Sequence, residues 1–355
     1  PFSARYSATA NGDIVYVANT LLTAPGTGSA ATKARNGASS DLNDDFNMAY
    51  VDVDSDASTF NSSRADLALP AGGSILFAGL YWGADSTSAA RNQVKFQVPG
   101  SSTYATINGS VVGSTSAGDY QGFADVTSLV KAAGAGTYGV ANVQARTGSN
   151  EYAGWSLVIV YADPSAPPRN LTVFDGYVRV DDSTPNVSIP ISGFRAPQAG
   201  PVKAAVGIIA YEGDLGLTGD SVTFNGTTLT DANNPSKNFF NGTIGNRGTT
   251  VATKAPNYVN QLGIDADIVA TSGLIAPNAT SATINLKTDS DQYFPGVVTT
   301  AIDLYAPAVS IAKSVVDVNG GGVQPGDVLE YTSVVQVTAG EAASQFVYFD
   351  PIPAN

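Results

Sequence analysis

The sequence predicts an all-β fold built from antiparallel β-sandwich domains in tandem. Composition is the first reason, because hydrophobic residues make up 43% of the 355 residues and charged residues only 13%, about half the usual globular share. The second reason is the identity of the polar residues. They are mainly Ser, Thr, Asn and Gly, which suit turns and strand faces, whereas the Glu, Lys and Arg that cover helix surfaces are scarce.

Strands are expected where short runs of β-branched and aromatic residues lie between Gly, Pro and Asn-Gly. In the first half these runs are Asp13–Asn19, Ser74–Trp82, Gln93–Val98, Val140–Ala145 and Trp155–Tyr161. In the second half they are Leu171–Phe174, Asn186–Ile191, Lys203–Tyr211, Ser221–Phe224, Ala282–Leu286 and Val297–Tyr305. Weak helical periodicity predicts one short helix at Ala124–Ala132.

Turn residues and a proline-rich stretch divide these strands. Asn-Gly pairs favour tight hairpin turns with positive φ, which predicts hairpins at Asn11-Gly12, Asn108-Gly109 and Asn225-Gly226. The stretch Asp163–Arg169 predicts a boundary between a β-sandwich at 1–168 and a second one at 169–306. The same pattern also fits one large sandwich of which 169–306 is the second half.

The last part of the chain, 307–355, predicts a separate module. Strands are expected at Val309–Val316, Val328–Val337 and Gln345–Phe349, with a turn at Gln324–Asp327. Roughly 50 residues are too few for a seven-stranded sandwich. We therefore expect an incomplete module, ended either by a cut in the chain or at a place where another chain supplies strands. The opening at Pro1 indicates a processed or trimmed chain.

This tail resembles the opening of the DUF11-type repeat, an immunoglobulin-like module of bacterial cell-surface proteins. The matching residues are Ala312-Lys313-Ser314, Val323-Gln324-Pro325-Gly326-Asp327, Leu329-Glu330-Tyr331-Thr332 and Asp350-Pro351-Ile352-Pro353-Ala354-Asn355. Residues 1–306 resemble the N-terminal region that precedes such repeats, in Asn43–Asp54, Phe77–Gly83, Asn170–Gly176, Tyr211–Asp220 and Phe294–Pro307. The resemblance implies an incomplete immunoglobulin-like first repeat at 307–355 and a secreted, envelope-attached structural protein.

Charge and residue content exclude several classes of function. A net charge of −13 argues against nucleic acids and anionic membranes as partners, because both require basic patches. The absence of Cys and His excludes Ser-His-Asp and Cys-His catalysis, ordinary zinc sites and disulfides. The longest apolar runs, Trp155–Ala162 and Ala204–Tyr211, are far shorter than the roughly 20 residues of a membrane-spanning helix.

Clustered aspartates are the candidate metal site. Calcium prefers six to eight oxygen ligands in irregular geometry, which suits a segment dense in carboxylates. The candidate ligands are Asp41, Asp44, Asp45, Asp52, Asp54 and Asp56. Calcium is therefore the one cofactor that the sequence suggests, and a solvated acidic loop is the alternative. The pairs Asp265/Asp267 and Asp289/Asp291 are expected on an exposed strand face and in a turn, and neither singles out an acid and a base for glycoside hydrolysis.

Lys313 raises the possibility of a Lys–Asn isopeptide bond. Such a bond needs a neutral amine in an apolar core and a nearby carboxyl group, here Glu330. The alternative is a solvent-facing strand lysine. Tyr81-Trp82 and Trp155 are the candidate sugar-stacking residues, but they lie in hydrophobic runs, and the tryptophans are expected in the core.

These observations predict a non-enzymatic structural or adhesive surface module of a bacterial fibre or adhesin, without catalytic residues. A filament subunit completed by strands from a neighbouring chain is the alternative, and a carbohydrate-binding module is the third hypothesis. The expected partners are other copies or neighbouring modules of the fibre, and a glycan or protein receptor. The expected location is the cell surface or an extracellular filament.

Overall fold

A computed structural model describes residues 1–339, 341–343 and 346–351, and its secondary structure is nearly all β, as predicted. In the described residues the helices are α1 (Ser29–Arg35), α2 (Thr127–Ala133) and a 3-10 helix at Asn43–Asp45. Helix α2 confirms the short helix expected at Ala124–Ala132. None of the described helices is long and apolar enough to cross a membrane.

The largest sheet has eleven strands in the order β18-β17-β20-β14-β22-β12-β1-β11-β5-β9-β8. Their bounds are β1 Ser3–Thr20, β5 Ser74–Asp85, β8 Ser110–Ser114, β9 Asp119–Asp125, β11 Ala153–Ala162, β12 Pro168–Asp175, β14 Ala204–Tyr211, β17 Ile244–Asn246, β18 Thr249–Thr250, β20 Ile264–Ala270 and β22 Phe294–Asp303. The long strand β1 pairs with β11 along one part and with β12 along the other. Strands from both sides of residue 168 therefore share one sheet.

Smaller sheets cover the large one. The five-stranded sheet, in the order β19-β4-β10-β6-β7, contains β4 Ser62–Leu67, β6 Gln93–Gln97, β7 Ala105–Asn108, β10 Gly136–Ala141 and β19 Lys254–Ala255. The four-stranded sheet, in the order β13-β21-β15-β16, contains β13 Asn186–Ser192, β15 Ser221–Phe224, β16 Thr227–Thr228 and β21 Ser281–Lys287. Strands β2 Leu22–Thr23 and β3 Ala49–Tyr50 form a short pair.

Two apolar cores lie between the large sheet and the smaller sheets, which makes the packing sandwich-like. The first joins β5 and β11 to the five-stranded sheet and contains Trp82 and Trp155. These two tryptophans are direct cross-strand partners and are 0% and 1% exposed, so the expectation that they belong to the core is confirmed. The second core joins β14 and β22 to the four-stranded sheet, with Ile208 and Ile284 among its members.

A third core lies on the opposite face of the large sheet. It contains Tyr16 and Val160 from β1 and β11, together with Ile209 and Ile268 from β14 and β20. Strands β1 and β20 contact each other although three strands separate them in the sheet order. The large sheet is therefore curved, and its two halves face each other across this third core.

The Asn-Gly pairs have three different outcomes. Asn225-Gly226 forms the predicted hairpin turn between β15 and β16, with φ angles of 50° and 82°. Asn108-Gly109 instead joins β7 and β8, which belong to different sheets. The prediction at Asn11-Gly12 is wrong, because both residues lie inside β1. Gly12 allows the backbone of β1 to approach β11 closely, because a Cβ at this position would lie 2.1 Å from the carbonyl oxygen of Tyr161.

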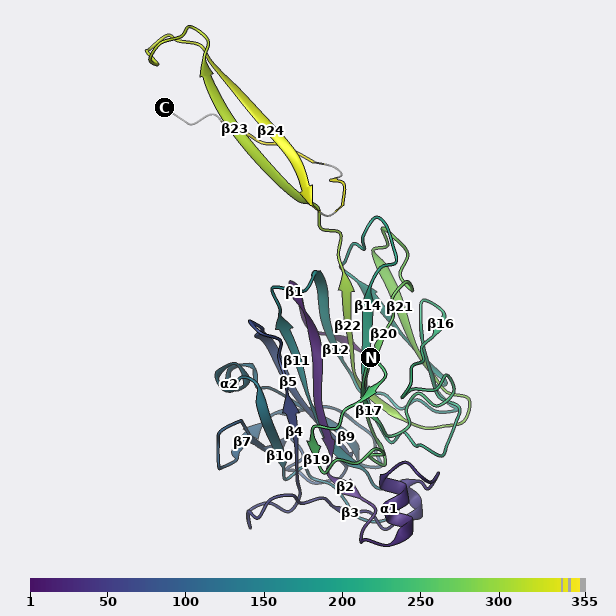
Figure 1. Cartoon of the computed structure of the whole chain (residues 1–355). Coiled ribbons are helices and arrows are strands. Elements are labelled where there is room, and N and C mark those ends of the chain that lie inside the picture. The colour runs from purple at the N-terminus through teal and green to yellow at the C-terminus, as the bar shows by residue number, and fades with distance from the viewer. Residues whose placement is uncertain (340, 344–345, 352–355) are drawn as a thin grey trace.

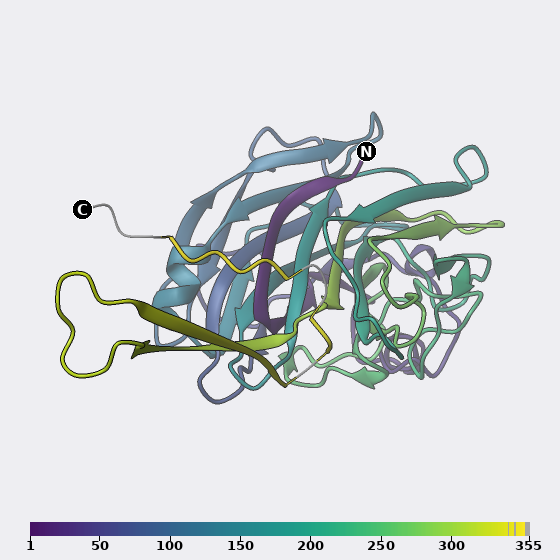
Figure 2. The ribbon, with the colours of Figure 1, turned by 90° about the horizontal axis from the view of Figure 1, so that it is seen from above.

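The C-terminal part forms a hairpin of β23 (Ala308–Asp317) and β24 (Leu329–Ala339) that projects from the body (Figures 1 and 2). These strands confirm those expected at Val309–Val316 and Val328–Val337. Residues 346–349 of the third expected strand are not in a strand, and Gln345 lies outside the described residues. The hairpin alone does not establish a tandem immunoglobulin-like arrangement.

Candidate functional site

The first group of predicted calcium ligands surrounds the 3-10 helix Asn43–Asp45. Asp41 accepts a hydrogen bond from the Ser39 hydroxyl at 2.8 Å, and the carboxylate of Asp45 accepts one from the backbone N–H of Leu42 at 2.9 Å. The side chain of Asp44 is exposed. The two bonded carboxylates thus serve the local turn.

The second group forms its own polar loop. Asp52 accepts a hydrogen bond from Ser62 at 2.7 Å, and Asp56 accepts one from the backbone N–H of Ser58 at 2.9 Å. One oxygen of Asp54 accepts from the N–H of Asp56 and the other from the hydroxyl of Tyr104, at 2.9 and 2.6 Å. Burial alone would raise the pKa of Asp54, but these hydrogen bonds lower it. No three acidic side chains in the described residues are grouped as a metal site requires.

The candidate isopeptide residues lie on opposite strands of the hairpin. Glu330 is paired with Val316, whereas Lys313 is paired with Ser333. The ammonium group of Lys313 is bonded to both carboxylate oxygens of Asp350, at 2.7 and 2.8 Å, and its side chain is 41% exposed. The hydrogen bond with Asp350 raises the pKa of Lys313. This environment favours the charged amine, whereas isopeptide chemistry needs a neutral one.

The prediction that Asp265 and Asp267 lie on an exposed face is wrong. They are 0% and 1% exposed and point toward the side of β20 that carries Val269 of the second core. The backbone N–H groups of Gly242 and Thr243 donate to Asp265 at 2.8 and 3.2 Å. Burial and the charge of its neighbour raise the pKa of Asp265, and burial likewise raises that of Asp267.

Asp291, expected in a turn, is also buried, at 1% exposure, and belongs to the same acidic region. Burial together with the charges of Asp220 and Asp214 raises its pKa to about 8. The pKa of Asp220 is raised by burial to about 7, and so is that of Asp214. Because these carboxyl groups are inaccessible, they act on stability and offer no surface to a ligand from outside.

A pocket of about 280 Å³ opens at one end of the large sheet, and we call it the alanine-floored pocket. Ala205 on β14 is paired directly with Ala270 on β20 and with Ala301 on β22. Directly paired residues of an antiparallel sheet project to the same face. The three methyl groups therefore form one row across three strands, and the small side chains leave room above the sheet.

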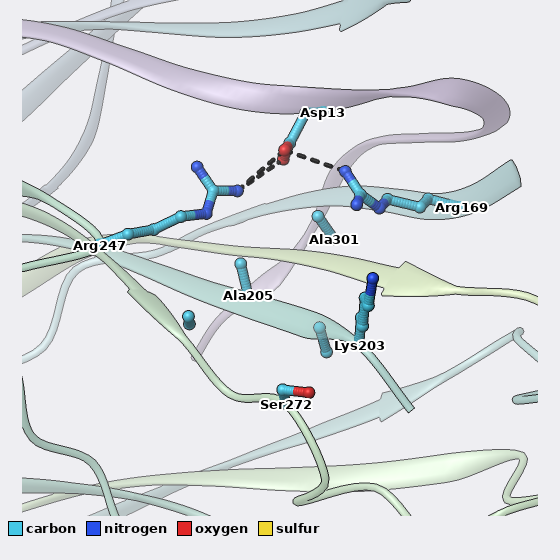
Figure 3. A pocket seen from close by; sticks show the side chains of 9 residues that line it. Asp13, Arg169, Lys203, Ala205, Arg247, Ser272 and Ala301 are labelled. Carbon is cyan, nitrogen blue, oxygen red and sulfur yellow. Dashed lines mark hydrogen bonds and ion pairs between the residues drawn. The ribbon is translucent and has the colours of Figure 1, made fainter. Parts of the chain in front are cut away.

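Basic side chains surround this floor. Asp13 lies between Arg169 and Arg247, each 2.9 Å from its carboxylate (Figure 3). Arg169 also bonds Asp303 at 2.8 Å. Burial would lower the pKa of Arg169, but these two acidic partners raise it. Arg169 is thus fully committed to contacts within the protein.

Lys203 differs from the two arginines. It lines the same pocket and is exposed, and its ammonium group makes no hydrogen bond or ion pair with any described residue. The lining residues include three cations and one anion, in a chain with only 17 basic residues and a net charge of −13. Because Asp13 and Asp303 pair with the two arginines, Lys203 is the cation of this lining whose charge no described residue balances.

Sequence reasoning missed this pocket. Arg169, Lys203 and Arg247 are more than thirty residues apart and belong to no motif. Strand pairing alone brings them together. The scarcity of basic residues was the one available signal, but it does not show which of them meet.

Solved structures give weak similarities. PNGase F, a glycosylasparaginase from Flavobacterium meningosepticum, is 9% identical with a TM-score of 0.22, covering 82% of this chain and 96% of that one. A structure of PNGF-II is 12% identical with a TM-score of 0.26, covering 69% and 60%. The major capsid protein P2 of bacteriophage PM2 is 11% identical with a TM-score of 0.17, covering 83% and 98%. TM-scores this low support no conclusion about fold or function.

A search of the curated proteins finds no match. The resemblance to DUF11-type repeats is wrong, because the family that matches is a different one and nothing supports such repeats. Those of the suggesting residues that lie at 312–332 form part of an ordinary hairpin, in which the Pro325-Gly326 loop, with φ of 103° at Gly326, has residues common to many turns. The match covers residues 35–279, well over half of the chain. The protein therefore belongs to the family described as "Protein of unknown function (DUF3344)".

Proposed function

We propose that this protein is a non-enzymatic adhesive module of the bacterial cell surface that binds an anionic group in the alanine-floored pocket. The observation that carries the proposal is the unpaired ammonium group of Lys203 beside the row of Ala205, Ala270 and Ala301. The row leaves space, and the lysine supplies a charge that no group of the described chain neutralises. The composition, poor in Lys, Arg and Glu, supports a location outside the cell.

The net charge of the protein makes the proposal testable on a charged surface. A protein of charge −13 is repelled by carboxylated beads, so retention on them requires a local positive site. We expect the protein to be retained on carboxylated or sulfated beads more than on neutral hydroxylated beads. Retention should weaken as salt is added, because exposed charges are screened.

Two variants locate the contact. Lys203→Glu reverses the unpaired charge, and Ala270→Leu fills the floor at an exposed position. A charge-assisted hydrogen bond contributes about 1.5–3 kcal/mol, so Lys203→Glu should reduce retention by about tenfold or more. Ala270→Leu should also reduce retention, because the larger side chain takes up the space above the floor. Lys237→Glu is the matched control, since it makes the same charge change at an exposed loop outside the pocket. Equal retention of Lys203→Glu and Lys237→Glu would refute the proposal.

A second candidate, the filament subunit, is favoured by the hairpin. Its apolar side chains are exposed, among them Val316 at 63% and Tyr331 at 57%. A two-stranded hairpin is marginal by itself. Strands added by a neighbouring molecule would cover these side chains and complete an immunoglobulin-like sandwich.

Light scattering over a range of concentrations tests this candidate. It predicts association that is lost in Ile311→Lys, a change in the middle of β23, where Ile311 is 51% exposed. A wild-type mass of about 36.2 kDa at every concentration would refute it.

A further inference from the structure

A second hollow, of about 270 Å³, opens beside the alanine-floored pocket, and we call it the apolar hollow. Arg247 lines both spaces. The walls of the hollow combine apolar side chains with polar ones. The apolar ones include Ile14, Tyr16, Tyr161, Ile244, Val251 and Ile268, and the polar ones are Asp66, Asn246, Arg247 and Thr253. Several of these side chains are buried members of the third core, whereas Tyr161 and Val251 are partly exposed. The hollow is thus a place where the third core opens to the outside, and Tyr161 on its wall packs against the first core.

Strand β20 connects the two spaces. Ile268 lines the apolar hollow and Ala270 lines the alanine-floored pocket. Residues two apart on a strand project to the same face, about 7 Å from each other. The ion pair between Asp13 and Arg247, at 2.9 Å, lies where the spaces meet and links β1 to the turn between β17 and β18. A ligand that fills both spaces must therefore pass over Arg247.

The charges of the two spaces differ. The alanine-floored pocket contains the unpaired Lys203, whereas the cation of the apolar hollow is Arg247, already bonded to Asp13. The rim of the hollow carries Asp66, which is exposed and repels anions. The anionic part of a ligand is thus favoured in the pocket, and its uncharged part in the hollow.

We propose that the ligand is a carboxylate that carries an aromatic or branched aliphatic group, with the anion in the pocket and the apolar group in the hollow. The anion lies beside Lys203 and the apolar group lies against Tyr161 and Val251. This inference rests on the proposed function and specifies its ligand class. Both a free aryl acid and the C-terminal residue of a peptide that ends in a large apolar side chain have this chemistry.

Ligand-observed NMR titrations with small probes test the inference. The probes are 4-phenylbutyrate, glucuronate as an anion without an apolar group, and 4-phenylbutyramide as the uncharged analogue. Burying about 60 Å² of ring surface contributes enough to tighten binding about tenfold. We expect 4-phenylbutyrate to bind about tenfold more tightly than glucuronate, and the amide to bind at least tenfold more weakly than the acid.

Variants separate the two spaces. Val251→Asn places an uncharged polar group in the apolar hollow, and should reduce 4-phenylbutyrate binding to the level of glucuronate without changing glucuronate binding. Lys203→Glu should abolish the binding of both acids. If glucuronate binds as tightly as 4-phenylbutyrate and both depend on Lys203, this inference is overturned and the proposed function stands. If neither acid binds, both fail.

Two peptides then distinguish the sources of the carboxylate. Acetyl-Gly-Phe with a free carboxylate and the same peptide with a C-terminal amide differ only in the anion. A peptide ligand predicts that the free acid binds at least as tightly as 4-phenylbutyrate and that the amide does not bind. If both peptides fail while 4-phenylbutyrate binds, the source is a free acid and the ligand class is retained.

Discussion

The buried carboxyl groups of Asp220 and Asp291 make the stability of this protein depend on pH in an unusual direction. Burial raises the pKa of Asp220 from an ordinary value of 3.8 to about 7, and burial together with the charge of Asp220 raises that of Asp291 to about 8. An acid with a raised pKa binds its proton more tightly in the folded state than in the unfolded chain. Its contribution is therefore present at low pH and is lost as the pH rises from about 4 to about 8.

The size of the effect follows from the number of protons released. We count one proton for the pair, because the two groups repel each other when ionised. Between pH 5 and pH 8 the folded state keeps this proton, whereas the unfolded chain has released it. The free energy of unfolding therefore falls by about 4 kcal/mol, at about 1.4 kcal/mol per pH unit. For a protein of 355 residues, whose unfolding entropy is about 0.75 kcal/mol/K, such a loss lowers the melting temperature by roughly 5 °C.

Thermal melts at pH 5 and pH 8, both with a chelator so that no cation neutralises the acids, measure this difference. Asp291→Asn removes the titrating group without changing its shape, so the variant should lose less stability on going to pH 8 and melt above the wild type there. Asp289→Asn is the matched control, because Asp289 is exposed and two residues away. A wild-type melting temperature that stays constant or rises between pH 5 and pH 8 would refute the reasoning.

Two further predictions concern packing and covalent chemistry. Gly122→Ala should lower the melting temperature by about 1–4 °C, since the added Cβ would lie 2.2 Å from the ring of Trp82 and overpacking costs about 1–3 kcal/mol. Gly28→Ala, which meets no atom within 4 Å, should change it less. Intact-mass spectrometry should show no loss of ammonia, because the exposed Lys313 is held charged by Asp350; the loss of one ammonia, mapped to Lys313, would contradict this.

The fold class and most strands were predictable because local composition determines them. Runs such as Trp155–Tyr161 have no alternative in a chain so poor in helix-forming residues, and their burial follows from their apolar content. Asn11-Gly12 shows the limit of local signals. Its preference for a turn is overridden by the pairing of β1 with β11 and β12, which keeps both residues extended.

The candidate site was not predictable, because it depends on contacts between distant strands. The alternation of Asp265 and Asp267 correctly places both on one face of a strand, but which face is covered depends on the segment that contains Gly242 and Thr243. Likewise, Arg169 and Lys203 meet only because β12, β22 and β14 are neighbours in the sheet. Composition gave the number of basic residues, and strand order determined where they gather.

Calcium binding by the acidic segment is untested, and the hydrogen bonds of its carboxylates lead us to expect little binding. Both oxygens of Asp54 already accept hydrogen bonds, from Thr59 and Tyr104 at 2.9 and 2.6 Å, and one oxygen of Asp52 accepts from Ser62. A cation would have to replace these bonds, so its net gain is small. We therefore expect melts with calcium and with chelator at pH 7 to coincide. A midpoint that falls on chelation in the wild type, but not in Asp54→Asn, would show that the segment binds calcium after all, because a ligand that binds only the folded state raises its stability.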